Sequence, residues 1–215
     1  MKNLLFLVLL VPIIFIDYGC ESNSVEPQDN DTTCVVDRKP NLYIYPKDTL
    51  NLSIEIAFPN GGEILESIPE YNDSWNVVVN PNGKIDNIYY YLYYECKIPK
   101  LTQKEYGWLI KNEKLKEFFE DNMKTSGFNQ REINDFIEYW IPVFTDFEYY
   151  EIYPQFNETL KNMIEVKFSV APDNFYRLHY LVIGRNDSKL NLIPPHVEVA
   201  KREKYFSVEW GVILE

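Results

Sequence analysis

The stretch Phe128-Asn-Gln-Arg-Glu-Ile-Asn-Asp-Phe-Ile-Glu-Tyr-Trp-Ile-Pro142 is the best-specified element of this sequence, and it predicts a short helix with one buried face. Asn129 is a favourable N-cap, because its side-chain oxygen accepts an otherwise unpaired N–H of the first turn, and Glu132 completes a capping box. Apolar residues recur at helical spacing along one face: Ile133, Phe136, Ile137, Trp140 and Ile141. Pro142 ends the helix because its ring clashes with a preceding helical turn. The segments on either side must therefore supply the surface that this face covers.

A second helix is predicted just before the first. Its apolar stripe consists of Leu115, Phe118, Phe119 and Met123. Gly127 follows this stripe and is a typical C-terminal stop. Because the connection between the two helices is very short, we expect them to form a helical hairpin.

Alternating apolar and polar residues predict strands on both sides of this hairpin. The expected strands are 39–46, 52–58, 63–68, 75–79 and 88–98 before it, and 147–153, 164–170, 176–182 and 206–214 after it. Strands, a helical hairpin and further strands indicate an α+β fold. We expect mainly antiparallel β-sheet, as one sheet or two packed sheets, with the helical hairpin inserted.

The N-terminus has the pattern of an export signal. Lys2 precedes an apolar run over 4–16, which is too short for a membrane-spanning helix of about 20 residues. Gly19-Cys20 resembles the end of a bacterial lipoprotein signal, whose cysteine carries acyl chains such as palmitate, although Asp17 and Tyr18 depart from that pattern. We expect a lipidated Cys20; ordinary secretion is the alternative.

These features divide the chain into three parts. Residues 1–20 form the predicted signal peptide, 21–38 a flexible acidic tether, and 39–215 one globular domain. The net charge of −12 argues against nucleic acid, which is bound mainly through Lys and Arg. It also argues against anionic lipid headgroups, so the lipid on Cys20 should make the membrane attachment. The expected location is the bacterial cell envelope, outside the cytoplasm.

Cysteine usage leaves one question open. With Cys20 lipidated, Cys34 and Cys96 remain, and two cysteines in an oxidising compartment can form a disulfide. The alternative is two unpaired thiols, with Cys96 in the core and Cys34 on the tether.

Several segments resemble an uncharacterised family of bacterial secreted proteins and lipoproteins. The matching segments are Lys39-Pro-Asn-Leu-Tyr-Ile-Tyr-Pro46, Pro69-Glu-Tyr71 with Trp75, the aromatic strand ending in Glu95, Glu132-Ile-Asn-Asp-Phe-Ile-Glu-Tyr-Trp-Ile-Pro142, and Val208-Glu-Trp-Gly211. The resemblance implies a single exported domain and brings no activity.

Standard catalytic and metal-binding motifs are absent, so the sequence predicts no metal site, no cofactor and no assigned reaction. The only histidines are His179 and His196, which we interpret as ordinary strand and loop residues. A nucleophile pair of Cys96 and His179 is conceivable, but cysteine is common as a small core residue.

The candidate ligand site lies on the aromatic strand. One of its faces carries Tyr89, Tyr91, Tyr93 and Glu95, with Lys97 at the end, whereas Ile88, Tyr90, Leu92, Tyr94, Cys96 and Ile98 form the expected buried face. Aromatic rings stack on sugars while carboxylates accept their hydroxyl protons. Burial of the tyrosines against the hairpin is the alternative, and Trp75, Trp140 and Trp210 are expected in the core.

Three functions are compatible with these features. The leading interpretation is a lipid-anchored module that binds a glycan or an envelope protein. A hydrolase of envelope polysaccharide would need a carboxylate pair, such as Glu95 and Glu209, about 5–10 Å apart in a cleft. A structural lipoprotein without a ligand is the third.

Overall fold

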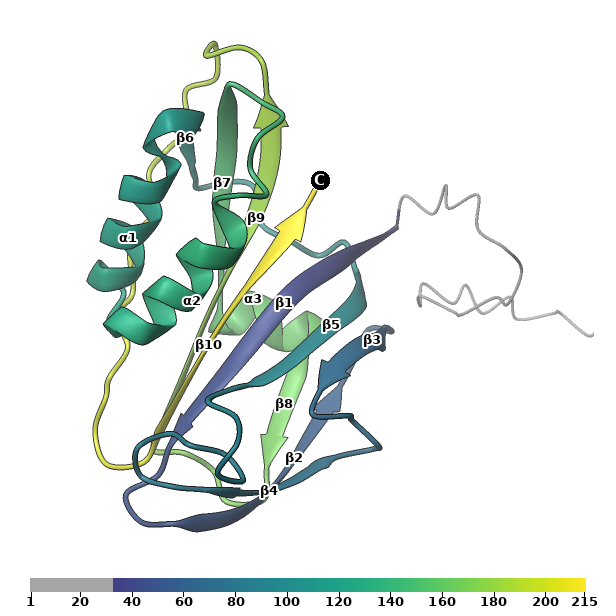
Figure 1. Cartoon of the computed structure of the whole chain (residues 1–215). Coiled ribbons are helices and arrows are strands. Elements are labelled where there is room, and N and C mark those ends of the chain that lie inside the picture. Colours follow the sequence, from purple (N-terminus) through teal and green to yellow (C-terminus); the bar gives the residue numbers. More distant parts are fainter. Residues whose placement is uncertain (1–32) are drawn as a thin grey trace, which may run out of the picture.

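The computed structural model describes residues 33–215, and the predictions for the signal peptide, Cys20 and most of the tether lie outside the described residues. The predicted fold class is confirmed, since two sheets are combined with a helical hairpin and one further helix (Figure 1).

The larger sheet has seven strands. In sheet order they are β3 (Glu63–Ile68), β5 (Leu92–Pro99), β1 (Cys34–Tyr45), β10 (Phe206–Leu214), β9 (Asn174–Arg185), β7 (Tyr149–Phe156) and β6 (Trp108–Lys111). All neighbours are antiparallel except β10 and β9, which run parallel. The smaller sheet has the order β4 (Trp75–Val79), β2 (Leu50–Ala57) and β8 (Glu165–Phe168).

The helices lie on both faces of the larger sheet (Figure 1). A short 3₁₀ turn (Asn112–Lys114) leads into α1 (Leu115–Thr125), which forms the predicted hairpin with α2 (Gln130–Trp140). The hairpin covers one face of the sheet, and the smaller sheet and α3 (Asn157–Met163) cover the other. Two cores result, one on each face of the larger sheet.

The predicted start of α2 is confirmed in detail. The Asn129 side-chain oxygen accepts the Glu132 N–H at 3.1 Å, and the Glu132 carboxylate accepts the Asn129 N–H at 2.8 Å. The apolar face of α2 is buried, and the Phe136 ring lies 5.2 Å from Trp210 and 5.7 Å from Tyr180. The hairpin therefore packs on β9 and β10, as expected for a helix with one apolar face.

Several predicted boundaries were displaced, and two of them were wrong by four residues or more. Residues 34–38, which we assigned to the tether, form the first part of β1 and pair with β5 and β10. The aromatic strand begins at Leu92 and not at Ile88, because Asp86 and Asn87 adopt positive φ in a turn. Ile88 and Tyr90, expected to be buried, are consequently exposed. β6 and α3 were not predicted.

The structure also decides the cysteine question against a disulfide between Cys34 and Cys96. Cys96 is a free thiol, fully buried opposite Asp37, whereas Cys34 lies opposite Pro99 in the pairing of β1 with β5. The two residues are displaced along the strands, so their side chains do not meet.

Candidate functional site

The four residues that the sequence singled out line one pocket. Its volume is about 530 Å³, and it is lined by Lys39, Glu66, Ile68, Ile88, Tyr89, Tyr90, Tyr91, Tyr93, Glu95 and Tyr139. The structure thus brings Tyr89, Tyr91, Tyr93 and Glu95 together, although their binding role stays a prediction. We call this cavity the tyrosine pocket.

Five chain segments build the tyrosine pocket. β5 supplies Tyr93 and Glu95, the turn before it supplies residues 88–91, β3 supplies Glu66, and α2 supplies Tyr139. Lys39 comes from a bulge in β1, where the register against both neighbouring strands shifts before Asn41. Its φ of 51° lies in the left-handed region, which is uncommon for residues other than glycine.

The Lys39 ammonium lies in a cage of tyrosine rings. Its nitrogen is 4.6 Å from the ring centroids of Tyr93 and Tyr139 and 5.8 Å from that of Tyr91. The negative face of an aromatic ring attracts a cation at these distances. Among residues 33–215, no carboxylate oxygen lies within the 4.0 Å of an ion pair with this nitrogen. The rings therefore provide its nearest favourable contacts.

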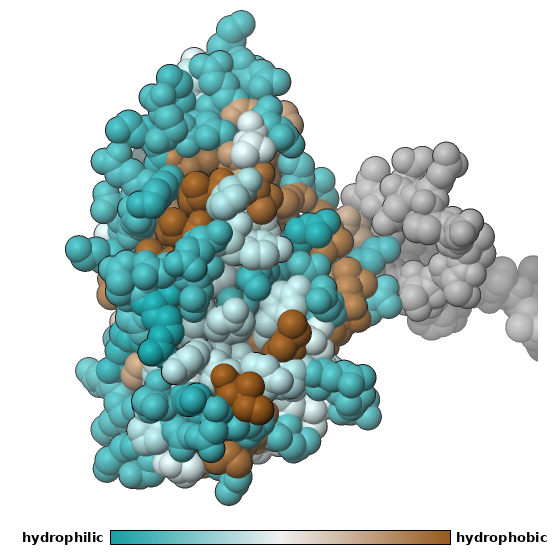
Figure 2. All heavy atoms as spheres, in the orientation of Figure 1, coloured by the Kyte–Doolittle hydropathy of each residue, from teal (hydrophilic) through white to brown (hydrophobic). Residues whose placement is uncertain are grey.

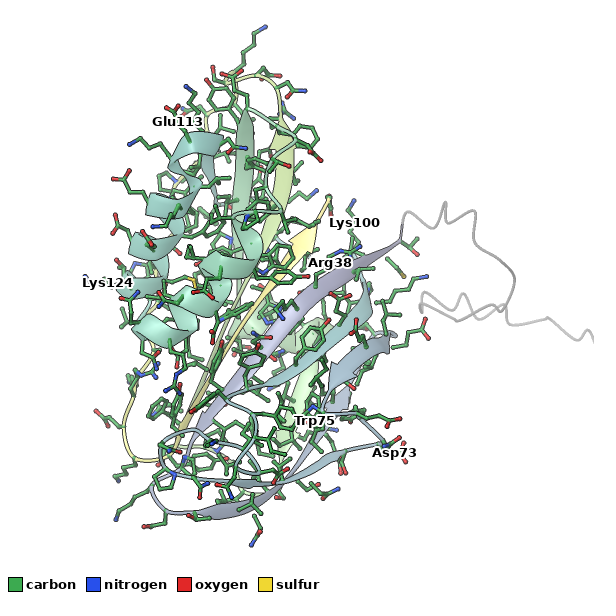
Figure 3. The ribbon with its side chains drawn as sticks, viewed as in Figure 1. Arg38, Asp73, Trp75, Lys100, Glu113 and Lys124 are labelled. Atoms are coloured by element: carbon green, nitrogen blue, oxygen red, sulfur yellow. The ribbon has the colours of Figure 1, made fainter. Side chains whose placement is uncertain are left out.

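Carboxylates surround the cage at longer range. Glu66 and Glu95 are directly opposite each other across β3 and β5, a placement of like charges that is unfavourable without a nearby cation. Arg38, labelled on β1 in Figure 3, approaches Glu95 to 4.0 Å. Asp135 on α2 accepts the Tyr43 hydroxyl at 2.8 Å and adds a third negative charge near Lys39.

Burial is the largest cause of the pKa shifts of Lys39 and Tyr93 in the pocket. It lowers the pKa of Lys39, and the charges of Glu95, Asp135 and Glu66 oppose this shift without cancelling it. Burial together with Glu95 and Glu66 raises the pKa of Tyr93, whose hydroxyl lies 3.4 Å from Glu66. Burial thus disfavours the charged forms of both Lys39 and Tyr93 in the pocket.

The rim of the pocket is apolar and accessible. Ile68, Ile88, Tyr90 and Tyr139 are 49%, 68%, 41% and 42% exposed. Figure 2 shows near-white and brown residues over the lower part of β1 and β5, and a second brown patch higher in the view. A cavity with a polar floor and an apolar rim has the composition of a small-molecule site.

A second polar cluster, which the sequence analysis missed, lies inside the molecule. His179 Nδ1 is 2.6 Å from Asp37 Oδ2, and its Nε2 is 3.1 Å from Glu209 Oε2. Arg177 Nε donates to the same Glu209 oxygen at 2.5 Å, and the Tyr94 hydroxyl donates to the other at 2.8 Å. We call these five residues the buried network.

Charges in the buried network balance one another. Burial alone would lower the pKa of His179, but the charges of and hydrogen bonds to Asp37 and Glu209 outweigh it and raise the pKa to about 9. Burial alone would raise the pKa of Glu209, but Arg177 and His179 lower it to about 2. At neutral pH the imidazolium therefore donates to both carboxylates.

The buried network is closed to a substrate. None of its five side chains is more than 4% exposed. Gly211 leaves room for it, since an added Cβ would lie 2.9 Å from His179 Nδ1 and 3.0 Å from Asp37 Oδ1. We therefore assign the network to the stability of the domain.

Two catalytic arrangements considered from the sequence do not match this geometry. Glu209 accepts from Tyr94, whereas Glu95 is the next residue of β5 and points to the opposite face of the sheet, so the two carboxylates do not share a cleft. The pKa of the Cys96 thiol is raised by burial and by Asp37, which disfavours the thiolate needed for a nucleophilic pair with His179.

The missed residues had a faint signal in the sequence. Arg177 and His179 alternate with apolar residues of β9 that are buried in the core under the hairpin, and their own face also carries Phe175 and Leu181. Charges among apolar neighbours on both faces of a strand indicated burial. Lys39 had no comparable signal, because its partners lie 52 to 100 residues further along the chain and meet only through the bulge.

In residues 33–215, no helix is long and apolar enough to cross a membrane, and no three His, Cys, Asp or Glu side chains are arranged to hold a metal ion. Comparisons with family models, with curated proteins and with solved structures found no match to this chain.

Proposed function

We propose that this protein is an exported, lipid-anchored protein of the bacterial cell envelope that binds a glycan in the tyrosine pocket. The observation that carries the proposal is the convergence of tyrosine rings, two facing carboxylates and an ammonium around one accessible cavity of about 530 Å³. Volumes of roughly 300–1,000 Å³ are typical of small-molecule sites.

The groups of the pocket match the two kinds of surface that a sugar presents. Its hydroxyls need both acceptors and donors, which Glu66, Glu95, the tyrosine hydroxyls and Lys39 supply. Its apolar ring face needs an aromatic or aliphatic surface, which the exposed Ile88 and Tyr90 supply at the rim. An envelope protein that docks on the same rim would be the alternative partner.

The predicted lipid anchor is consistent with the proposed location. Acylation of Cys20 would hold the domain at a membrane surface, since each buried methylene contributes about 0.8 kcal/mol of membrane affinity. The domain would then meet envelope glycans at high local concentration, so a modest intrinsic affinity would suffice.

A titration with defined glycans tests the proposal. The full chain in detergent is titrated calorimetrically with β-1,4 oligomers of N-acetylglucosamine, with those of glucose, and with muropeptides. We expect one class to bind, and the double variant Tyr90→Ala/Glu95→Gln to weaken that binding at least tenfold. The matched control is Tyr106→Ala/Glu63→Gln, because Tyr106 is as exposed as Tyr90 and Glu63 lies on β3 outside the pocket.

Two results would contradict the proposal. One is no heat with any glycan for a folded wild-type chain. The other is an equal loss of binding in the pocket variant and in the control. Binding of an envelope protein at the same residues, with no glycan bound, would establish the alternative partner and remove the glycan.

A further inference from the structure

We infer that the tyrosine pocket contains an ammonium-binding subsite, formed by the rings of Tyr91, Tyr93 and Tyr139, which Lys39 occupies until an ammonium group of the ligand replaces it. The inference deepens the proposed function and rests on it, because it names the chemical class of the ligand for the same pocket.

The geometry of the cage is the first support. Three ring centroids lie 4.6, 4.6 and 5.8 Å from one nitrogen, and the rings come from β5, the turn before it and α2. Aromatic cages of this kind recognise alkylated ammonium groups, because the negative ring faces attract a cation without requiring a directional hydrogen bond. A surface lysine often lies over a single ring. Here three rings from separate elements surround one nitrogen, which is the arrangement of a binding site for a cation.

The loose attachment of Lys39 is the second support. Among the described residues its nitrogen has neither an ion pair within 4.0 Å nor a hydrogen bond, although the side chain is half-buried. The charged amine loses hydration in the cage, and this burial lowers its pKa. The long lysine stem has several rotamers, and the ammonium regains its hydration when it turns outward.

The charge around the cage is the third support. Three carboxylates, those of Glu95, Asp135 and Glu66, act on Lys39, while Arg38 approaches only Glu95 and only to 4.0 Å. Exchange of one ammonium for another keeps the charge of the cage unchanged, whereas an anionic ligand would be repelled by the carboxylates and by the ring faces. The pocket therefore favours a cationic group over a carboxylate or a phosphate.

Two sources share this chemistry. An amino sugar carries a primary ammonium on a glycan, and a choline headgroup carries a quaternary one. The first would place its ring hydroxyls against the remaining pocket groups, Glu66 and Glu95 among them. The two sources are separated by the test below.

The test empties the cage. Lys39→Ala and wild-type full chain in detergent are titrated with choline and with its neutral isostere 3,3-dimethylbutan-1-ol. We expect Lys39→Ala to bind choline at least tenfold more tightly than the wild type does, and to prefer choline over the isostere. Lys84→Ala is the control, because the Lys84 nitrogen lies over a single ring, that of Tyr90, at 5.9 Å.

A second comparison uses oligomers of glucosamine and of N-acetylglucosamine, which differ in charge at the amine. Stronger binding of the glucosamine oligomers to the wild type assigns an amino sugar, and preference for choline alone assigns a quaternary headgroup. Tyr139→Ala, at an exposed ring, should reduce either preference at least fivefold, and it serves if Lys39→Ala does not fold.

The inference is overturned if folded Lys39→Ala binds choline and the isostere equally, or if it binds neither choline nor the glucosamine oligomers. It is also overturned if Tyr139→Ala leaves the preference for the amine unchanged. Wild-type binding of a neutral glycan without any preference for ammonium would leave the proposed function standing and remove only the subsite. A preference for ammonium without any binding of a glycan would leave the ammonium subsite standing and remove the glycan from the proposed function.

Discussion

At the scale of single residues, His179 shows how a buried charge is made stable. Its two ring nitrogens face Asp37 and Glu209, and Arg177 supplies the second positive charge. Two carboxylates therefore balance an imidazolium and a guanidinium within the second core. Removal of one member leaves a buried charge without its partner. Such a removal lowers the free energy of unfolding strongly, even where the intact pair itself adds little to it.

The first prediction concerns this residue. His179→Ala should lower the free energy of unfolding by about 3–5 kcal/mol, because Asp37 and the rest of the network lose a buried partner. Denaturant unfolding measures the loss, and His196→Ala, in an exposed loop, should change stability by less than about 0.5 kcal/mol. Equal effects of the two substitutions would show that the network does not stabilise the fold.

The second prediction is the dependence of stability on pH. The pKa of His179 is raised from 6.5 to about 9 on folding, so its stabilisation is complete below 6.5 and is lost as the pH rises through 9. The pKa of Glu209 is lowered from 4.5 to about 2, so its stabilisation is complete above 4.5 and is lost as the pH falls toward 2. The free energy of unfolding, measured from pH 2 to pH 9, should therefore be highest between pH 4.5 and pH 6.5.

The matched variant for this profile is His179→Gln, which keeps hydrogen-bonding groups without a titrating proton. It should flatten the decline between pH 6.5 and 9. It should reduce the acid decline without removing it, because Arg177 still lowers the pKa of Glu209. A wild-type profile that stays level up to pH 9 would contradict the assignment of a charged His179.

At the scale of elements, α2 connects the fold to the pocket. Its apolar face packs on β9 and β10, and Glu132 of its capping box accepts two hydrogen bonds from Arg202. Its exposed Tyr139 is part of the Lys39 cage, and the charge of its half-buried Asp135 acts on Lys39. The same helix thus fixes the core on one side and one wall of the tyrosine pocket on another.

The third prediction tests the cap of this helix. Asn129→Ala removes the acceptor of the Glu132 N–H and should destabilise the protein by about 0.5–2 kcal/mol. Asn134→Ala, at an exposed position within the same helix, is the control and should be neutral or slightly stabilising, because alanine has the higher helix propensity. A cap variant as stable as the control would show that the capping box does not determine where α2 begins.

The elements also differ in how far the sequence predicts them. The α2 region was predictable because its cap, apolar stripe and stop are local, and the structure has them where expected. The parallel pairing of β9 with β10 was not, because it joins two strands that are separated in the chain and is not encoded by a local pattern. The pocket was half predictable: Tyr91, Tyr93 and Glu95 share one stretch, whereas Lys39 and Tyr139 arrive from other elements.

At the scale of the whole molecule, the two cores leave only a limited surface for recognition. The hairpin covers one face of the larger sheet, and the smaller sheet covers the other (Figure 1). The tyrosine pocket lies alongside α2, between Tyr139 of that helix and the residues that β3 and β5 supply. The fold thus leaves the tyrosine pocket accessible, while many of the other aromatic rings in residues 33–215 are buried.

The fourth prediction concerns the attachment of the whole chain. If Cys20 is lipidated, wild-type protein should sediment with membranes, and Cys20→Ala should move it to the soluble fraction of the envelope. Mass spectrometry of the mature N-terminus provides the direct readout, and Cys96→Ala is the control for loss of a cysteine. An unmodified N-terminal peptide starting after Cys20 would exclude the anchor.

The most direct test of the central claim is to see which tyrosines a bound glycan perturbs. The chain has 17 tyrosines, and ring-¹³C labelling gives each one a signal that can be followed by NMR during a titration. We predict that a bound glycan shifts the signals of Tyr89, Tyr90, Tyr91, Tyr93 and Tyr139, and leaves those of Tyr106 and Tyr149 unchanged. Shifts confined to tyrosines outside the tyrosine pocket, or none at saturating glycan, would contradict it.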